Sequence, residues 1–269
     1  MTLRRCPIRI ILSSGFHSYP AYDSGVHKER LDQLIVRREL AESREKAQRL
    51  IRAGRVEVDR RVETKPGRAF PEDIDIRVRE AERFVSRGGD KLEAAFDAFT
   101  LDVHEAVCVD VGASTGGFTD CLLQHGARRV YAVDVGKGQL HWNLRNDDRV
   151  TVMEKVNARH LQPGDFEDPP AFAAVDVSFI SLTKILPALT KVLSPGAGIV
   201  TLIKPQFEAG RAEVEKGGVV RDAAVRNRVL DEIRGFGEKT LGWRWRGLCE
   251  SPVKGPAGNT EYLAYWEKP

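Results

Sequence analysis

The spacing of apolar residues near the front of the chain predicts a small unit of two short helices and a hairpin. Apolar residues recur at helical spacing over residues 31–35 and again over 44–53, where Ser43 is a suitable N-cap and Gly54 a suitable C-terminal stop. Residues 56–62 then alternate between apolar and charged, as in a hairpin. The front unit is therefore expected to be a small α+β domain.

From residue 106 onward the pattern changes to short, uninterrupted apolar runs. Such runs are typical of strands buried on both faces of a parallel sheet. We therefore expect an α/β fold of the Rossmann-like type, with strands near residues 106–111, 130–134, 150–156, 173–176, 199–203 and 261–266. With 269 residues, 42% of them hydrophobic, the chain is long enough for one such domain and a small companion. The sequence has no apolar run of about eighteen residues, the length that a membrane-spanning helix needs.

A turn rich in glycine follows the first of these runs. The run ends at Asp110, and Gly112, Gly116 and Gly117 precede a segment able to begin a helix. Glycine allows the backbone a positive φ and a close approach to a ligand, which the free N–H groups of the helix start can face. The second run ends at Asp134, where an acidic residue usually binds ribose hydroxyls. These features favour a nucleoside ligand.

Other chemistries for this turn and for the cysteines fit less well. The turn could simply be tight, with no ligand. Residues 112–116 also fit the hydrolase motif G-x-S-x-G, but that mechanism needs a later acid and then a histidine, and the last histidine is His160. The cysteines show no C-x-x-C pairing and no metal-ligand spacing, so we expect reduced thiols, a cytoplasmic protein and no metal site; they are Cys6, Cys108, Cys121 and Cys249.

Composition and charge suggest three segments. Residues 1–27 are expected to be a disordered leader or an over-long start, residues 28–82 the small domain with its linker, and residues 83–269 the α/β domain. The net charge of the whole chain is +3, and residues 28–66 contribute twelve basic and eight acidic residues. Positive charge is thus concentrated in the small domain.

That basic surface could bind RNA phosphates, although its acidic residues would also fit a merely solvated face. Residues 30–35 and 43–59 resemble the S4 RNA-binding module of ribosomal protein S4 and pseudouridine synthases, with Arg60 where the family often has glycine. The resemblance implies an RNA partner. The expected RNA-binding residues are Arg30, Arg37, Arg44, Lys46, Arg49, Arg52 and Arg55.

Blocks in the α/β domain resemble the FtsJ-type RNA methyltransferases. They lie at residues 86–92, 110–120, 133–137, 176–181 and 204–208. With an S4 module in front, the chain resembles more narrowly the TlyA family, also called hemolysin A. The resemblance implies transfer of a methyl group from S-adenosylmethionine to ribose 2′-hydroxyls, with ribosomal RNA or ribosomal subunits as the partner. It leaves the modified nucleotide and the oligomeric state open.

The resemblance also assigns roles to residues. FtsJ-type enzymes use a Lys-Asp-Lys-Glu tetrad, and the matching positions here are Lys91, Asp176, Lys204 and Glu261. A ribose hydroxyl is a weak nucleophile that must lose its proton as it attacks, and Lys204 is the candidate general base. The residues expected to bind S-adenosylmethionine are Asp110, Gly112, Ser114, Gly116, Gly117, Phe118, Asp134, Asn157 and Ala158.

Three rival functions belong to other classes. One is a non-catalytic RNA-binding or ribosome-associated factor that retains the fold. Another is a membrane-active hemolysin, as the hemolysin name of the family suggests. The lack of an apolar span in the sequence disfavours this function. The third is a nicotinamide-dependent oxidoreductase, because a Rossmann-like sheet also suits that cofactor.

Overall fold

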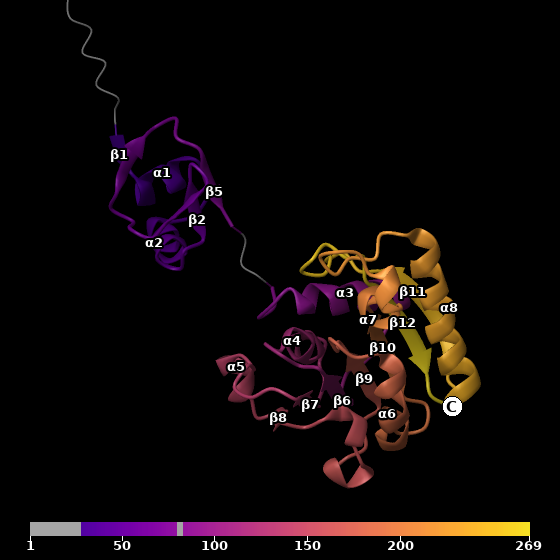
Figure 1. The fold of residues 1–269 in the computed structure, drawn as a ribbon. Coiled ribbons are helices and arrows are strands. Elements are labelled where there is room, and N and C mark those ends of the chain that lie inside the picture. The colour runs from indigo at the N-terminus through magenta and orange to yellow at the C-terminus, as the bar shows by residue number, and fades with distance from the viewer. Residues whose placement is uncertain (1–27, 80–82) are drawn as a thin grey trace, which may run out of the picture. The chain divides into compact units, whose positions relative to one another are not determined.

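The computed structural model describes residues 28–79 and 83–269, so the expected leader at residues 1–27 lies outside the described part of the chain. The chain divides into two compact units, one up to residue 81 and one from residue 82 onward. Each unit is described by itself below, and Figure 1 shows the elements of both.

In its described residues, 28–79, the N-terminal unit has two helices and five short strands. The helices are α1 (Leu31–Arg37) and α2 (Arg44–Arg52), and the strands are β1 (Lys28–Arg30), β2 (Val56–Val58), β3 (Arg61–Glu63), β4 (Ala69–Pro71) and β5 (Ile76–Val78). Strand β2 pairs antiparallel with β3 and β5, and β1 pairs antiparallel with β4. Both helices pack on a core formed by Leu31, Leu34, Ile35, Ala47, Ile51, Val56, Val58 and Ile76.

Local sequence explains the ends of these elements. The Ser43 hydroxyl accepts a hydrogen bond from the backbone N–H of Lys46 at 3.2 Å, and Gly54 has a positive φ of 69° just after α2, so both expected helix ends are confirmed. The hairpin is also confirmed. Asp59 and Arg60 at its turn both have positive φ, 46° and 64°, as turns of type I′ require.

The C-terminal unit is a seven-stranded sheet with helices on both faces (Figure 1). The strands are β6 (Val107–Val111), β7 (Arg129–Asp134), β8 (Val150–Glu154), β9 (Phe172–Val175), β10 (Gly198–Ile203), β11 (Arg244–Glu250) and β12 (Tyr262–Glu267). The main helices are α3 (Gly88–Phe99), α4 (Gly117–Gln124), α5 (Trp142–Arg145), α6 (Leu186–Val192), α7 (Pro205–Glu208) and α8 (Ala223–Thr240). The expected α/β fold is confirmed.

The strand order is β11-β12-β10-β9-β6-β7-β8. Five strands, from β10 to β8, run parallel, and β12 runs antiparallel between β10 and β11. The chain moves outward from β6 through β7 to β8 and then returns to β9 on the other side of β6. The topological switch point, where open α/β sheets bind ligands, therefore lies between β6 and β9.

Alternate residues of the buried strands pack on opposite faces of the sheet. Val109 belongs to the core under α6 and α8, whereas its neighbour Cys108 belongs to the core under α3 and α4. Strand β8 ends at Glu154, earlier than expected, because Lys155 turns the chain with a positive φ of 58°. Across residues 28–79 and 83–269 no helix is both long and apolar enough to span a membrane.

Candidate active site

Two cavities lie at the carboxyl ends of β6 and β9, at the switch point. The larger has a volume of about 560 Å³, and the residues that line it include Asp134, Val135, Val156, Asn157, Ala158, Phe179 and Ile185. The smaller has a volume of about 300 Å³, and the residues that line it include Ser86, Lys91, Gly117 and Phe118. Gly112, Ser114 and Asp176 line both. Most of the catalytic and cofactor-binding residues expected from sequence thus meet at one edge of the sheet.

Glycine is required at two positions of the turn after β6. Gly112 has a φ of 88°, and a Cβ there would lie 2.3 Å from the carbonyl oxygen of Asp176. Gly116 has a φ of 100°, and a Cβ there would lie 2.3 Å from Cδ1 of Leu144. Any other residue would combine backbone strain with a clash. The turn therefore packs directly on the chain that leaves β9.

Asp110, near the end of β6, stabilises this turn through hydrogen bonds to Thr119 in α4. Its side chain is fully buried, and Oδ2 accepts hydrogen bonds from the backbone N–H of Thr119 at 2.9 Å and from the Thr119 hydroxyl at 2.7 Å. The other oxygen, Oδ1, is buried without a hydrogen-bond partner among the described residues. Burial raises the pKa of Asp110 to about 7, and the negative charge of Asp176 adds to the effect. Asp110 thus fixes the first turn of α4 against the end of β6.

Asp134 orders the wall of the larger cavity. Its Oδ2 accepts from the backbone N–H of Ser114 at 2.8 Å, and its Oδ1 accepts from the N–H of Gly136 at 2.6 Å. Asn157 follows the next strand, and its side-chain oxygen accepts from the N–H of Arg159 at 3.1 Å. A carboxylate beside an apolar slot suits the ribose and the base of a nucleoside.

The structure brings the four expected catalytic residues together. Lys91 Nζ donates to Glu261 Oε2 at 2.6 Å and lies 4.0 Å from Asp176 Oδ2. Lys204 Nζ lies 2.5 Å from Asp176 Oδ1 and donates to the Ser178 hydroxyl at 2.8 Å. Lys91, Lys204 and Glu261 are all buried. Two amines and two carboxyl groups therefore lie together in a largely enclosed space.

The sheet order explains why these residues meet. Asp176 and Lys204 directly follow the neighbouring strands β9 and β10, and Glu261 directly precedes β12, the next strand in the sheet. Lys91 comes from the first turns of α3. Because β12 is antiparallel to β10, its beginning lies at the edge where the parallel strands end.

Besides Ser178, three polar or aromatic side chains around the tetrad were missed by the sequence analysis. Gln206 donates to Glu261 Oε1 at 3.1 Å, and the Phe207 ring centroid lies 5.8 Å from Lys204 Nζ. Phe179 is 91% exposed, has a positive φ of 63°, and its ring centroid lies 5.0 Å from that of Phe207. Phe179 and Phe207 each stand three residues after a tetrad residue, a repeated spacing that could have drawn attention to them.

The expected RNA-binding residues of the N-terminal unit fall into two groups. Arg30 and Arg44 both contact the buried carboxylate of Asp32, each at 3.0 Å. Burial alone would raise the pKa of Asp32, but hydrogen bonds from Arg30, Gln48 and Arg44 hold it well below its usual range. Arg37 pairs with Glu29 at 2.8 Å. These three arginines are therefore partly engaged within the unit.

The second group lies on and just after α2. Lys46, Arg49 and Arg52 are exposed on that helix, and Arg55 follows it half-buried. Residues at positions i, i+3 and i+6 of a helix lie along one side. This row of Lys46, Arg49 and Arg52, called the α2 basic row below, is the most open cationic surface among the expected residues.

Fold and site together define a class: a Rossmann-like enzyme domain, with a nucleoside-type turn beside a buried charged tetrad, in a chain that also carries a small basic module. Residues 84–268 match the FtsJ-like methyltransferase family, and residues 29–71 match the S4 domain. The chain therefore belongs to the FtsJ-like methyltransferases with an S4 domain, the TlyA or hemolysin A family.

Relatives are similar over most of their length. The "16S/23S rRNA (cytidine-2'-O)-methyltransferase TlyA" of Mycobacterium tuberculosis is 45% identical, covering 88% of this chain and 89% of that protein. "Hemolysin A" of Brachyspira hyodysenteriae is also 45% identical, covering 88% of this chain and 99% of that protein. A solved structure from Streptococcus thermophilus that carries a hemolysin name is 47% identical, with a TM-score of 0.70, and the match covers 91% of this chain and 90% of that one.

Proposed function

We propose that this protein transfers a methyl group from S-adenosylmethionine to ribose 2′-hydroxyls of ribosomal RNA. The observation that carries the proposal is the tetrad of Lys91, Asp176, Lys204 and Glu261 beside the glycine turn, on a chain of the family described above. The name of the Mycobacterium tuberculosis relative specifies ribosomal RNA and the 2′ oxygen of cytidine. Such a substrate would be met in the cytoplasm.

The residues at the switch point fit S-adenosylmethionine. Two glycine positions have no room for a Cβ, a buried carboxylate oxygen of Asp110 lacks a partner among the described residues, and the larger cavity joins Asp134 to an apolar slot. Asp134 would bind the ribose, Asn157 and Ala158 would contact the adenine, and Gly112 with Ser114 would face the methionine end. When bound, this cofactor supplies a methyl group activated by its sulfonium charge, so the protein mainly positions the reactants.

The tetrad would handle the hydroxyl group of the substrate. The 2′ oxygen gains the methyl group and loses its proton, and Lys204 Nζ, as the neutral amine, would accept that proton. Asp176 and Ser178 hold Lys204 Nζ at 2.5 and 2.8 Å, so the amine is positioned before the substrate binds. Glu261 holds Lys91 in the same way, at 2.6 Å.

The RNA would be held by two kinds of contact. The α2 basic row would bind phosphates, with a strong dependence on salt concentration. The exposed ring of Phe179, at the rim of the larger cavity, would stack on a base next to the reacting ribose. Its positive φ of 63° is unusual for an aromatic residue, and backbone strain of this kind clusters at functional sites.

Lys204→Ala tests the assignment. The assay follows methyl incorporation into ribosomal RNA and maps the ribose modification by mass spectrometry, with Lys191→Ala, on the exposed side of α6, as the control. We expect Lys204→Ala to lower the rate by about 10²–10⁴-fold while the Kd for S-adenosylmethionine changes by less than about twofold. Equal rates in Lys204→Ala and in the parent would remove Lys204 from the mechanism. A parent protein that binds ribosomal RNA but adds no methyl group would point to the non-catalytic factor instead.

A further inference from the structure

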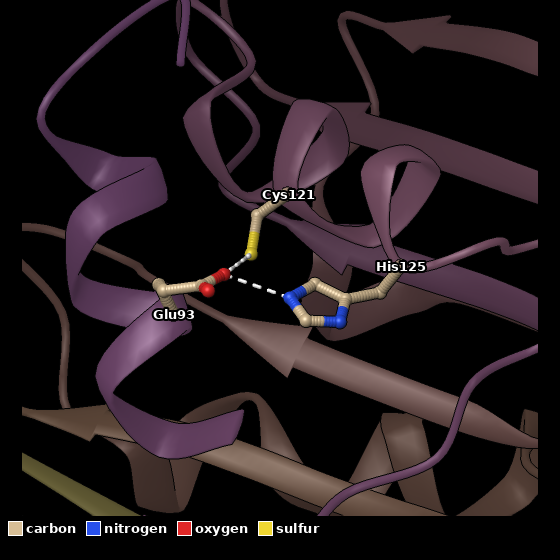
Figure 2. Close-up of side chains that lie close together, drawn as sticks. All are labelled: Glu93, Cys121 and His125. Atoms are coloured by element: carbon tan, nitrogen blue, oxygen red, sulfur yellow. Dashed lines mark hydrogen bonds and ion pairs between the residues drawn. The ribbon is translucent and has the colours of Figure 1, made fainter. Parts of the chain in front are cut away.

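Three side chains able to bind a metal meet between α3 and α4, outside the proposed active site. They are Glu93 on α3, Cys121 on α4 and His125 at the C-cap of α4. Figure 2 shows the three turned toward one another, with the carboxylate between the thiol and the imidazole. Glu93 Oε2 lies 3.6 Å from Cys121 Sγ and 2.7 Å from His125 Nε2, and all three donor atoms lie within 4.8 Å of one another.

The surroundings hold each of these groups in place. Cys121 and His125 stand four residues apart, so one side of the helix presents both. The Phe96 ring stacks flat on the imidazole, with centroids 3.8 Å apart and planes 3° apart. Arg83 binds Oε1 of Glu93 at 2.5 Å and leaves Oε2 to the other two groups. Carboxylate ligands of metals are commonly hydrogen-bonded through their second oxygen in this way.

We propose that Glu93 Oε2, Cys121 Sγ and His125 Nε2 form a zinc site, with a solvent molecule as the fourth ligand. One oxygen, one sulfur and one nitrogen ligand suit Zn²⁺, which binds these atoms tetrahedrally. In such a site the ligand atoms are about 3.5 Å apart. The oxygen–sulfur distance of 3.6 Å already has this value, and the oxygen–nitrogen distance of 2.7 Å needs only a small side-chain rotation to reach it.

Exposure and charge also fit a bound ion. Cys121 is fully buried, whereas the side chains of Glu93 and His125 are 18% and 29% exposed, so the ion could enter from solvent on their side. Binding would displace the thiol proton of Cys121 into solvent, and the metal would keep its oxidation state. The cysteine spacing does not predict this site, because Glu93 lies 28 residues before Cys121.

The ion would cross-link two helices that contribute residues to the proposed active site. Helix α3 also carries Lys91, two residues before Glu93, and α4 begins at Gly117 in the glycine turn. The ion would act on the packing of these helices and not on the reacting groups, because Lys91 faces Glu261 while Glu93 faces α4. It would add a metal cross-link where α3 and α4 are already joined by packing and by the contacts of Glu93 with Cys121 and His125.

Cobalt titration of the full-length protein tests the site, after removal of bound metal with a chelator. We expect one Co²⁺ per chain, with an absorption band in the near ultraviolet from charge transfer between thiolate and cobalt, and loss of that band on addition of Zn²⁺. Cys121→Ser should abolish the band, whereas Cys249→Ser, which changes a cysteine on β11 far from the cluster in sequence, should retain it. A band that persists in Cys121→Ser, or no band in the parent, would overturn the proposal.

Thermal unfolding gives a second test of the zinc site, and it does not depend on changing a cysteine. His125→Gln and Glu93→Gln keep the size of each side chain at partly exposed positions, so both variants should fold, as circular dichroism can verify. Zn²⁺ should raise the Tm of the parent and leave that of both variants unchanged. The same rise in all three proteins would show that zinc binds elsewhere and would refute the site.

Discussion

Asp110 offers a quantitative test of how the glycine turn is built. Burial raises the pKa of this carboxyl from its ordinary value of 3.8 to about 7 in the folded protein. Between these two values the folded protein keeps a proton that the unfolded chain has lost. The free energy of unfolding therefore contains a contribution that is complete below about pH 4 and is lost as the pH rises through about 7.

The separation of about three pH units corresponds to about 4 kcal/mol in total, of which about 2–3 kcal/mol falls between pH 5 and pH 8. Asp110→Asn has the same shape, can still accept from Thr119, and does not titrate. Its unpartnered amide imposes a cost that does not vary with pH. We therefore expect the stability of Asp110→Asn relative to the parent to improve by about 2–3 kcal/mol from pH 5 to pH 8.

Urea unfolding at several pH values measures this difference, with the fluorescence of the buried Trp243 and Trp266 as the signal for the C-terminal unit. Asp97→Asn, an exposed change on α3, serves as the control and should show no such trend relative to the parent. A difference between Asp110→Asn and the parent that stays constant across the pH range would refute the account of a buried, protonated Asp110.

Three further changes test the site. Gly112→Ala should weaken binding of S-adenosylmethionine by about tenfold or more in calorimetry, whereas Gly138→Ala, with a similar φ of 70° but open space for a Cβ, should bind normally. Phe179→Ala should lower kcat/KM for RNA by about 5–150-fold, the equivalent of a stacking contact of about 1–3 kcal/mol, and leave cofactor affinity unchanged; unaltered kinetics would exclude stacking. Arg49→Ala should reduce the slope of log affinity for RNA against log salt concentration by about one, whereas Arg234→Ala on α8 should not, and equal slopes would remove Arg49 from the contact.

Patterns of apolar and polar residues predicted the elements whose burial determines their sequence. Uninterrupted apolar runs identified the parallel strands because both faces of those strands are buried. Strand β11 and helix α8 were not predicted. In Arg244–Glu250 half-buried and exposed residues alternate and several are charged, so this edge strand lacks an apolar run.

In the site, too, some features follow from sequence patterns and others depend on the three-dimensional fold. The strands predicted near residues 173–176 and 199–203 imply that Asp176 and Lys204 share an edge, since parallel neighbours end together. The contacts of Ser178 and Gln206 with the tetrad depend on loop conformation, which no periodic pattern encodes. Likewise, Arg30 was predicted from the sequence to bind RNA, and only the fold shows that its side chain pairs with Asp32.

Gly112 and Asp176 link the glycine turn to the tetrad. A Cβ at position 112 would meet the backbone carbonyl of Asp176, so the turn packs on the same residue that supplies a tetrad carboxylate. Asp176 lines both cavities and lies 2.5 Å from Lys204 Nζ and 4.0 Å from Lys91 Nζ. Because β6 and β9 pair directly, this contact is fixed by the sheet before any ligand binds. A change at Gly112 should therefore disturb both cofactor binding and methyl transfer, whereas a change at Lys204 should disturb methyl transfer alone.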